Sequence, residues 1–254
     1  VYEMGPVSIA MERVALRWLA AQVGFSAGAD GVLTSGGSAG NLTALLAMRQ
    51  AMAGFDAWAG GGGHDLAVLT GEQTHYCVRR SAQILGWGSG GVVPVACDDR
   101  FRLDPRDLEP ALARARAAGR RVIGVVGSAC STATGAIDPL DELAHFAERH
   151  GLWFHVDGAH GASFVLSPDL RPRFRGIQRA HSLVWDAHKM MLTPALLTAV
   201  LFREGGRSYQ SFAQEASYLF AGQDPEEGWF DVGMRTLECT KRMMGFVLYA
   251  TVAT

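Results

Sequence analysis

Apolar residues recur along this chain first at helical spacing and then in short runs. Residues 8–23 repeat apolar positions every three to four residues, which predicts an amphipathic helix. Beyond them, short apolar runs predict buried strands at 66–70, 92–96, 122–127, 152–157, 183–186 and 197–202, and Leu33-Thr34 marks the end of a further strand. Helical stretches between the runs cover 42–53, 108–118 and 139–150.

Strands that alternate with helices predict an α/β fold, in which a mostly parallel sheet is flanked by helices on both faces. In such sheets, functional sites lie at the carboxyl ends of the strands. Neither an internal repeat nor a clear linker interrupts the chain, so residues 1–254 are treated as one large domain.

Composition narrows the classes of function. With 48% hydrophobic and 19% charged residues, the chain can bury a large core. A net charge of −2 gives no electrostatic case for binding nucleic acid or an anionic membrane surface, and the longest apolar stretch, 190–202, is too short to span a bilayer. The four cysteines form no CxxC pair, which fits a cytoplasmic protein that binds a small molecule.

A glycine-rich turn runs from Thr34 to Asn41, between a predicted strand and a helix. Gly37 and Ser38 would let the backbone approach an anion at the helix start, where unpaired N–H groups and the helix dipole favour a phosphate. Taken alone, a turn of this kind is more often only a turn.

Two chemically suggestive side chains each follow a buried strand. Asp157 needs a cationic or hydrogen-bonding partner, and a protonated pyridine nitrogen would supply one, although a strand-end aspartate more often caps a turn. Lys189 lies just beyond the strand at 183–186, where loss of solvent would make its amine nucleophilic. Most lysines are surface residues, but of 23 basic residues only Lys189 and Lys241 are lysines.

Taken in order, these motifs resemble the fold type I pyridoxal-phosphate enzymes. More closely, the chain resembles the group II amino-acid decarboxylases, which include the aromatic-amino-acid, glutamate, cysteine-sulfinate and diaminobutyrate decarboxylases. The resemblance extends from Tyr2-Glu3 through the glycine turn, Thr74-His75, 134–140, 155–159 and 186–189 to 235–239. It implies pyridoxal 5′-phosphate as the cofactor, an L-amino acid as the substrate, an amine and CO2 as the products, and a homodimer.

The resemblance also implies roles for individual residues. Lys189 matches the lysine that holds the cofactor as an imine, Asp157 the partner of the pyridine nitrogen, and His75 the histidine that stacks on the ring. These three are the predicted catalytic residues. The predicted cofactor-binding residues are Gly37, Ser38, His75, Thr132, Asp157, Ala159, Asp186, His188 and Lys189, and Asp186 stands where many members have asparagine.

The chain departs from the family pattern in two respects. The family's proton donor is a tyrosine on a mobile loop, but the matching stretch 221–234 has none and offers only Glu226, Glu227, Trp229 and Phe230 near that place. Family members are longer, so we expect this chain to lack an amino-terminal segment and a carboxyl-terminal small domain.

Alternatives stay open at this point. A relative of the same family could form an aldehyde or a transaminated product, or could keep only the fold without activity. A different class, a metalloenzyme, would use ligands from His155, Asp157, His160, His181, Asp186 and His188. Nothing else in the chain matches a metalloenzyme, so no metal is predicted.

Overall fold

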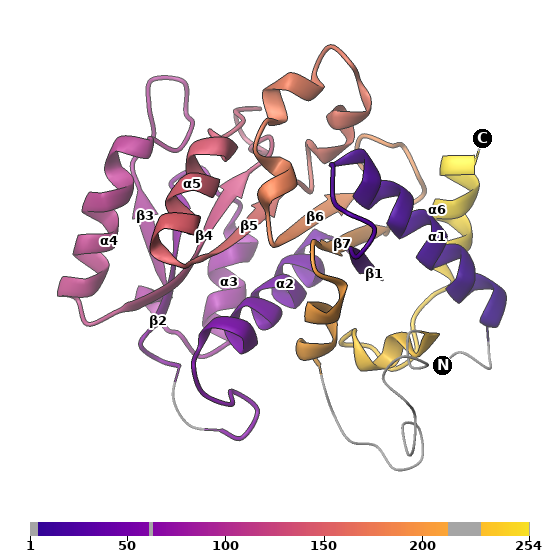
Figure 1. Ribbon diagram of the computed structural model, residues 1–254, viewed down its shortest axis with the longest axis horizontal. Helices are drawn as coiled ribbons and strands as arrows, with labels where there is room; N and C mark the ends of the chain where they lie inside the picture. Colours follow the sequence, from indigo (N-terminus) through magenta and orange to yellow (C-terminus); the bar gives the residue numbers. More distant parts are fainter. Residues whose placement is uncertain (1–4, 61–62, 213–229, 254) are drawn as a thin grey trace.

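A computed structural model describes residues 5–60, 63–212 and 230–253 of the chain (Figure 1). Its α-helices are α1 (Pro6–Gln22), α2 (Gly37–Met52), α3 (Tyr76–Ile84), α4 (Leu108–Ala117), α5 (Leu140–His150) and α6 (Met244–Ala253). Its strands are β1 (Asp30–Thr34), β2 (Leu66–Gly71), β3 (Val92–Val95), β4 (Arg121–Ser128), β5 (Trp153–Asp157), β6 (Ser182–Asp186) and β7 (Thr198–Phe202). Short 3-10 helices are η2 (Ser89–Gly91), η3 (Pro105–Asp107), η4 (Ala162–Leu166), η5 (Arg171–Phe174), η6 (Ile177–Arg179), η7 (Gly205–Gln210) and η9 (Val232–Met234).

The strands form one mixed sheet in the order β1-β7-β6-β5-β4-β2-β3. Strands β3, β2, β4, β5 and β6 run parallel, whereas β7 pairs antiparallel with both β6 and β1. Because β5 and β6 are parallel neighbours, Asp157 and Asp186 come to the same edge of the sheet, each as the last residue of its strand.

Two apolar clusters, one on each face, hold the helices against the sheet. One cluster joins buried residues of α1, α4, α5 and α6, and the other joins those of α2 and α3. Strands β5, β6 and β7 are buried along their whole length, as expected for strands covered on both faces. No helix in the described ranges is long and apolar enough to cross a membrane.

Strand β1 lies at the end of the sheet order, so one of its edges has no partner strand among the described residues. Buried charged side chains from distant parts of the chain cover that edge. The Leu33 N–H donates to the Glu12 carboxylate (3.0 Å), and the Leu33 carbonyl accepts from the Lys241 ammonium (3.0 Å). Further along β1, the Gly31 carbonyl accepts from the Arg235 guanidinium (2.8 Å). Covering an edge in this way satisfies its backbone groups and prevents pairing with another chain.

The predicted alternation of strands and helices is confirmed, and each predicted strand is present with ends that differ by at most two residues. One helix begins earlier than predicted, at Gly37 rather than Leu42, because the glycine turn itself forms its first turn. Helices α3 and α6 were not predicted. The first has a one-sided pattern but is only nine residues long, which leaves few repeats to recognise. The second is apolar on every side, so it lacks the one-sided pattern that signals a surface helix.

Candidate active site

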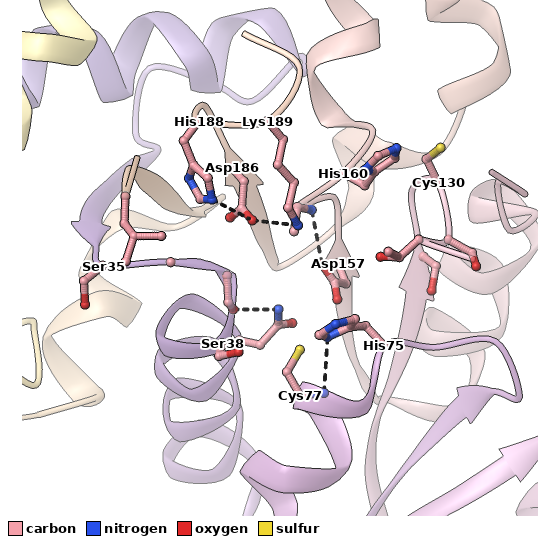
Figure 2. A pocket seen from close by; sticks show the side chains of 18 residues that line it. Ser35, Ser38, His75, Cys77, Cys130, Asp157, His160, Asp186, His188 and Lys189 are labelled. Atoms are coloured by element: carbon pink, nitrogen blue, oxygen red, sulfur yellow. Dashed lines mark hydrogen bonds and ion pairs between the residues drawn. The ribbon is translucent and has the colours of Figure 1, made fainter. Parts of the chain in front are cut away.

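A cavity of about 300 Å³ opens where the carboxyl ends of β4, β5 and β6 meet the start of α2 (Figure 2). Every residue predicted to bind the cofactor lines it. The lining residues are Ser35, Gly36, Gly37, Ser38, Asn41, His75, Cys77, Ser128, Cys130, Ser131, Thr132, Asp157, Ala159, His160, Asp186, His188, Lys189 and Leu196. The fold therefore brings together residues that are more than 150 positions apart in the sequence.

The start of α2 forms one wall. Gly36 adopts a φ of 116°, which favours glycine, and Gly37 begins the helix. A Cβ added to Gly37 would lie 2.9 Å from a carboxylate oxygen of Asp186 and 3.3 Å from the Cβ of Ala159. Glycine is therefore required here by the close approach of two other elements. The first N–H groups of the helix have no intrahelical acceptor and can bind an anion.

Asp157 is buried at the end of β5, with 7% of its surface exposed. The Ala159 N–H donates to its carboxylate (3.1 Å), and the Asn41 side chain adds a hydrogen bond. Burial is the main cause that raises the pKa of Asp157, and the nearby Asp186 carboxylate raises it further. Among the described residues Asp157 forms no ion pair, so this site can accept a cationic partner.

A series of buried hydrogen bonds holds the Asn41 side chain in place. The Asn41 amide nitrogen donates to the Gly37 carbonyl (2.9 Å), so its oxygen faces Nε2 of His155 (2.9 Å), which must carry the proton. Burial lowers the pKa of His155 to about 4, so the ring is neutral and Nδ1 accepts from the Ser182 hydroxyl (2.8 Å). That hydroxyl accepts in turn from the Trp153 indole (2.9 Å). These bonds fix the orientation of the Asn41 amide beside Asp157.

Lys189 lies beside a second carboxylate of the cavity, that of Asp186. Lys189 Nζ is 2.9 Å from Asp186 Oδ2, and the Thr198 hydroxyl donates to Asp186 Oδ1 (2.6 Å). The Lys189 side chain is 34% exposed. The side chain is therefore not shielded from solvent as its position after an apolar strand suggested, because the turn after β6 leaves it open to the cavity, where a carboxylate pairs with it.

His75 reaches the cavity because it caps a helix. Its Nδ1 accepts from the backbone N–H of Cys77 at the start of α3 (3.3 Å), which fixes the ring at the cavity wall. Cys77 itself is buried, and burial is the main cause that raises the pKa of its thiol to about 12, so it stays uncharged. Thr132 and Cys130 complete the wall from the loop after β4.

The candidate metal ligands do not form a metal site. Both ring nitrogens of His155 are used by Ser182 and Asn41, and Nδ1 of His181 accepts from the Phe154 N–H (2.9 Å). Within the described part of the chain, no group of three or more His, Cys, Asp or Glu side chains could hold a metal ion. The metalloenzyme alternative therefore has no ligand set in this part of the molecule.

The second lysine does not reach the cavity. Lys241 Nζ is 2.5 Å from Glu12 Oε1, and both side chains are buried. Lys189 is thus the lysine that the cavity offers. Sequence reasoning gave Asn41 no role in the site and named His155 only as a possible metal ligand. The signal for their supporting role was the position of Asn41 four residues after Gly37 and of His155 two before Asp157. Glu226 and Glu227 lie outside the described residues.

Comparison with known proteins identifies the family. Residues 1–253 match the pyridoxal-dependent decarboxylase conserved domain. The chain belongs to this family. It is 36% identical over 244 residues to cysteine sulfinic acid decarboxylase of Mus musculus, covering 95% of this chain and 49% of the relative. It is 34% identical over 247 residues to acidic amino acid decarboxylase GADL1 of Xenopus tropicalis, covering 96% of this chain and 48% of the relative.

Solved structures of the family agree on the fold. The crystal structure of mouse CSAD matches with a TM-score of 0.89 and 32% identity, over 99% of this chain and 52% of that one. The structure of Oryza sativa TDC with PLP and tryptamine matches with a TM-score of 0.88 and 25% identity, over 100% of this chain and 54% of that one. The predicted fold type I architecture, a mostly parallel mixed sheet flanked by helices, is confirmed. The chain spans about half the length of the curated relatives it matches.

The residues of the cavity fit pyridoxal 5′-phosphate. The buried carboxylate of Asp157, which has no ion-pair partner among the described residues, suits a protonated ring nitrogen. The helix start at Gly37 suits a phosphate, and Lys189 supplies an amine in the same cavity. Each of these three chemical needs is met by a different element.

Proposed function

We propose that this chain contributes the active site of a pyridoxal-phosphate-dependent decarboxylase, which converts an L-amino acid to its amine and CO2. The observation that carries the proposal is the placement of Lys189 and the buried, cation-free Asp157 in one cavity. Family membership supports it, as do the names of the relatives, which are decarboxylases of cysteine sulfinic acid and acidic amino acids.

Residues of three elements would each bind a different part of the cofactor. When bound, the cofactor supplies an aldehyde that binds amines and a protonated ring that accepts the electron pair left on the α carbon when CO2 departs. Lys189 would attach it, and Asp157 would hold the proton on the ring nitrogen. Gly37 and Ser38 would bind the phosphate at the start of α2, while Asn41 keeps the Asp157 carboxylate oriented.

The remaining predicted residues surround these. His75, fixed by its capping bond to Cys77, would lie against the ring face, and Thr132, Ala159 and His188 would contact the cofactor from the other walls. His188 is held in place by a contact of 2.8 Å between its Nδ1 and the Leu197 carbonyl oxygen.

The attachment site can be tested directly by borohydride reduction of the chain supplied with pyridoxal phosphate, followed by peptide mapping. We expect the reduced cofactor on Lys189. Lys241→Arg leaves Lys189 as the sole lysine and keeps a cation beside Glu12, so it should retain the chromophore. Lys189→Ala should lose the reducible chromophore. Cofactor mapped to Lys241, or none at all, would overturn the proposal.

The reaction is tested by product analysis over a panel of L-amino acids that begins with cysteine sulfinic acid and the acidic amino acids. Release of amine and CO2 in equal amounts is the expected result. Aldehyde as the main product would contradict decarboxylation to an amine as the overall reaction.

We also propose that the protein is a cytoplasmic homodimer that acts on a small-molecule substrate without nucleic acid or membrane partners. All four cysteines lie in the described ranges and are free thiols, which fits a reducing compartment. Sedimentation equilibrium would measure the oligomeric state, and a monomer at micromolar concentration would contradict the dimer.

A further inference from the structure

Asp186 is the most deeply buried acid of the cavity, with 1% of its surface exposed. Its carboxylate accepts one hydrogen bond and forms one close ion pair. Thr198 donates to Oδ1 (2.6 Å), and Lys189 Nζ lies 2.9 Å from Oδ2. His188 Nε2 is farther away, at 3.8 Å from Oδ2. In Figure 2 the side chains of Lys189 and His188 both point toward this carboxylate.

The same carboxylate lies against the start of α2. The nearest atoms to a Cβ built on Gly37 are Oδ2 and Oδ1 of Asp186, at 2.9 and 3.1 Å. The helix start is where an anion is stabilised by free N–H groups and by the helix dipole. An anionic group of the protein itself therefore lies next to the place where a phosphate would bind.

The balance of charge in the cavity determines how strongly the Asp186 carboxylate would repel a phosphate. Among the described lining residues, two buried carboxylates, Asp157 and Asp186, face Lys189, which is the sole lysine or arginine there. The ammonium is paired with Asp186. A phosphate that enters this cavity would meet a carboxylate at close range in a medium of low dielectric, where like charges repel strongly.

We propose that Asp186 is an internal counterion that competes with the cofactor phosphate for the start of α2 and thereby weakens cofactor loading. This inference rests on the proposed function, since it concerns the phosphate of the same cofactor. The carboxylate stabilises the ammonium of Lys189 in the cofactor-free protein, and its charge opposes the phosphate when the cofactor arrives.

The test replaces the carboxylate with a neutral side chain of the same size, in Asp186→Asn. Two probes that lack an aldehyde cannot attach to Lys189: pyridoxine 5′-phosphate and pyridoxine. Their dissociation constants are measured by titration calorimetry on the cofactor-free full chain. We expect the variant to bind pyridoxine 5′-phosphate about tenfold more tightly, a gain of about 1.4 kcal/mol, while pyridoxine changes by less than about threefold.

A matched control distinguishes the effect of the Asp186 charge itself from the effect of a change in the net charge of the protein. The carboxylate of Glu238 is partly exposed and accepts from the hydroxyl of Ser35, which lines the cavity (2.9 Å), so Glu238→Gln also removes one negative charge. It should change the affinity for pyridoxine 5′-phosphate by less than about threefold, because a charge in contact with solvent is screened. Asp186→Ala, which removes the carboxylate without adding an amide, should tighten binding in the same direction as Asp186→Asn.

Equal tightening of both probes in Asp186→Asn, no tightening of the phosphate probe, or an equal effect of Glu238→Gln would each overturn the inference. Such results leave the proposed function intact if wild-type protein still carries reduced cofactor on Lys189. Failure of the proposed function would instead appear as absence of cofactor from Lys189 in wild type.

Discussion

The Asp157 carboxylate is costly to the cofactor-free protein and useful to the loaded one. It is buried without an ion-pair partner among the described residues, and burial raises its pKa. A raised carboxyl pKa means that the folded state holds the proton more tightly than the unfolded state. Stability from this group is therefore present below the unfolded pKa and is lost as pH rises through the folded one.

Asp157→Asn should consequently separate stability from function. In the cofactor-free chain at neutral pH, the amide removes a buried charge, so the melting temperature should rise by about 2–4 °C for each kcal/mol gained. Decarboxylation should fall by about two orders of magnitude or more, because an amide cannot hold the proton on the ring nitrogen. Differential scanning calorimetry and steady-state kinetics measure the two effects, and an unchanged turnover would contradict the assigned role.

The neutral His155 predicts an acid-sensitive core. Its pKa, lowered by burial from about 6.5 to about 4, gives stability that is present above the unfolded pKa and is lost as pH falls toward 4. Within that window the contribution changes by about 1.4 kcal/mol per pH unit. His155→Gln should flatten the pH dependence of urea unfolding between pH 4 and 6.5, whereas the exposed His64→Gln should leave the slope as in wild type.

For individual residues, the sequence predicted where a side chain lies in the fold better than which side chains it contacts. The ends of β5 and β6 could be located from apolar runs, so Asp157 and Lys189 could be placed near one another. The partners could not be predicted, because the pairing of Lys189 with Asp186 depends on how the turn after β6 closes. The bond between His155 and Asn41 depends on how α2 packs on β5.

Among the elements, α2 has the most direct part in the site, because its first turn meets Asp186 and Ala159. Gly37→Ala places a methyl group 2.9 Å from the Asp186 carboxylate, so either the helix start or the carboxylate must move. We expect cofactor affinity to fall by about tenfold or more, with the helix content unchanged. The matched control is Gly206→Ala, whose added Cβ meets nothing within 4 Å, and circular dichroism with cofactor titration measures both variants.

Helix α6 shows what apolar pattern alone misses. Its residues are apolar on every side, so no periodic face marks it as a helix in the sequence. It becomes a helix because it packs on α1, so closely that a Cβ on Gly245 would lie 2.4 Å from the Ser8 carbonyl oxygen. Such a contact between the two ends of the chain is set by tertiary packing.

On the scale of the whole molecule, the two ends of the chain close the open edge of the sheet. Glu12 comes from α1, Lys241 from the segment before α6, and Arg235 from the segment after η9. Arg235 Nη1 also pairs with Asp30 Oδ2 at 3.1 Å. The motif at 235–239, which the sequence linked to the family, therefore serves in part to complete the fold around β1.

The buried pair of Glu12 and Lys241 gives a prediction about the stability of the whole chain. Lys241→Met leaves a buried carboxylate without its cation and the Leu33 carbonyl without its donor, so the free energy of unfolding should fall by about 3–5 kcal/mol. Combining it with Glu12→Gln removes the stranded charge, so the double variant should lose less than the sum of the two single losses, by about 1 kcal/mol or more. Urea unfolding of the wild type, the two single variants and the double variant measures this coupling.

Arg207→Met, which breaks the exposed pair with Glu204, serves as the control, and its free energy of unfolding should fall by no more than about 1 kcal/mol. Strictly additive losses for Glu12 and Lys241 would mean that the two side chains act independently, and the edge of β1 would then be held by other contacts.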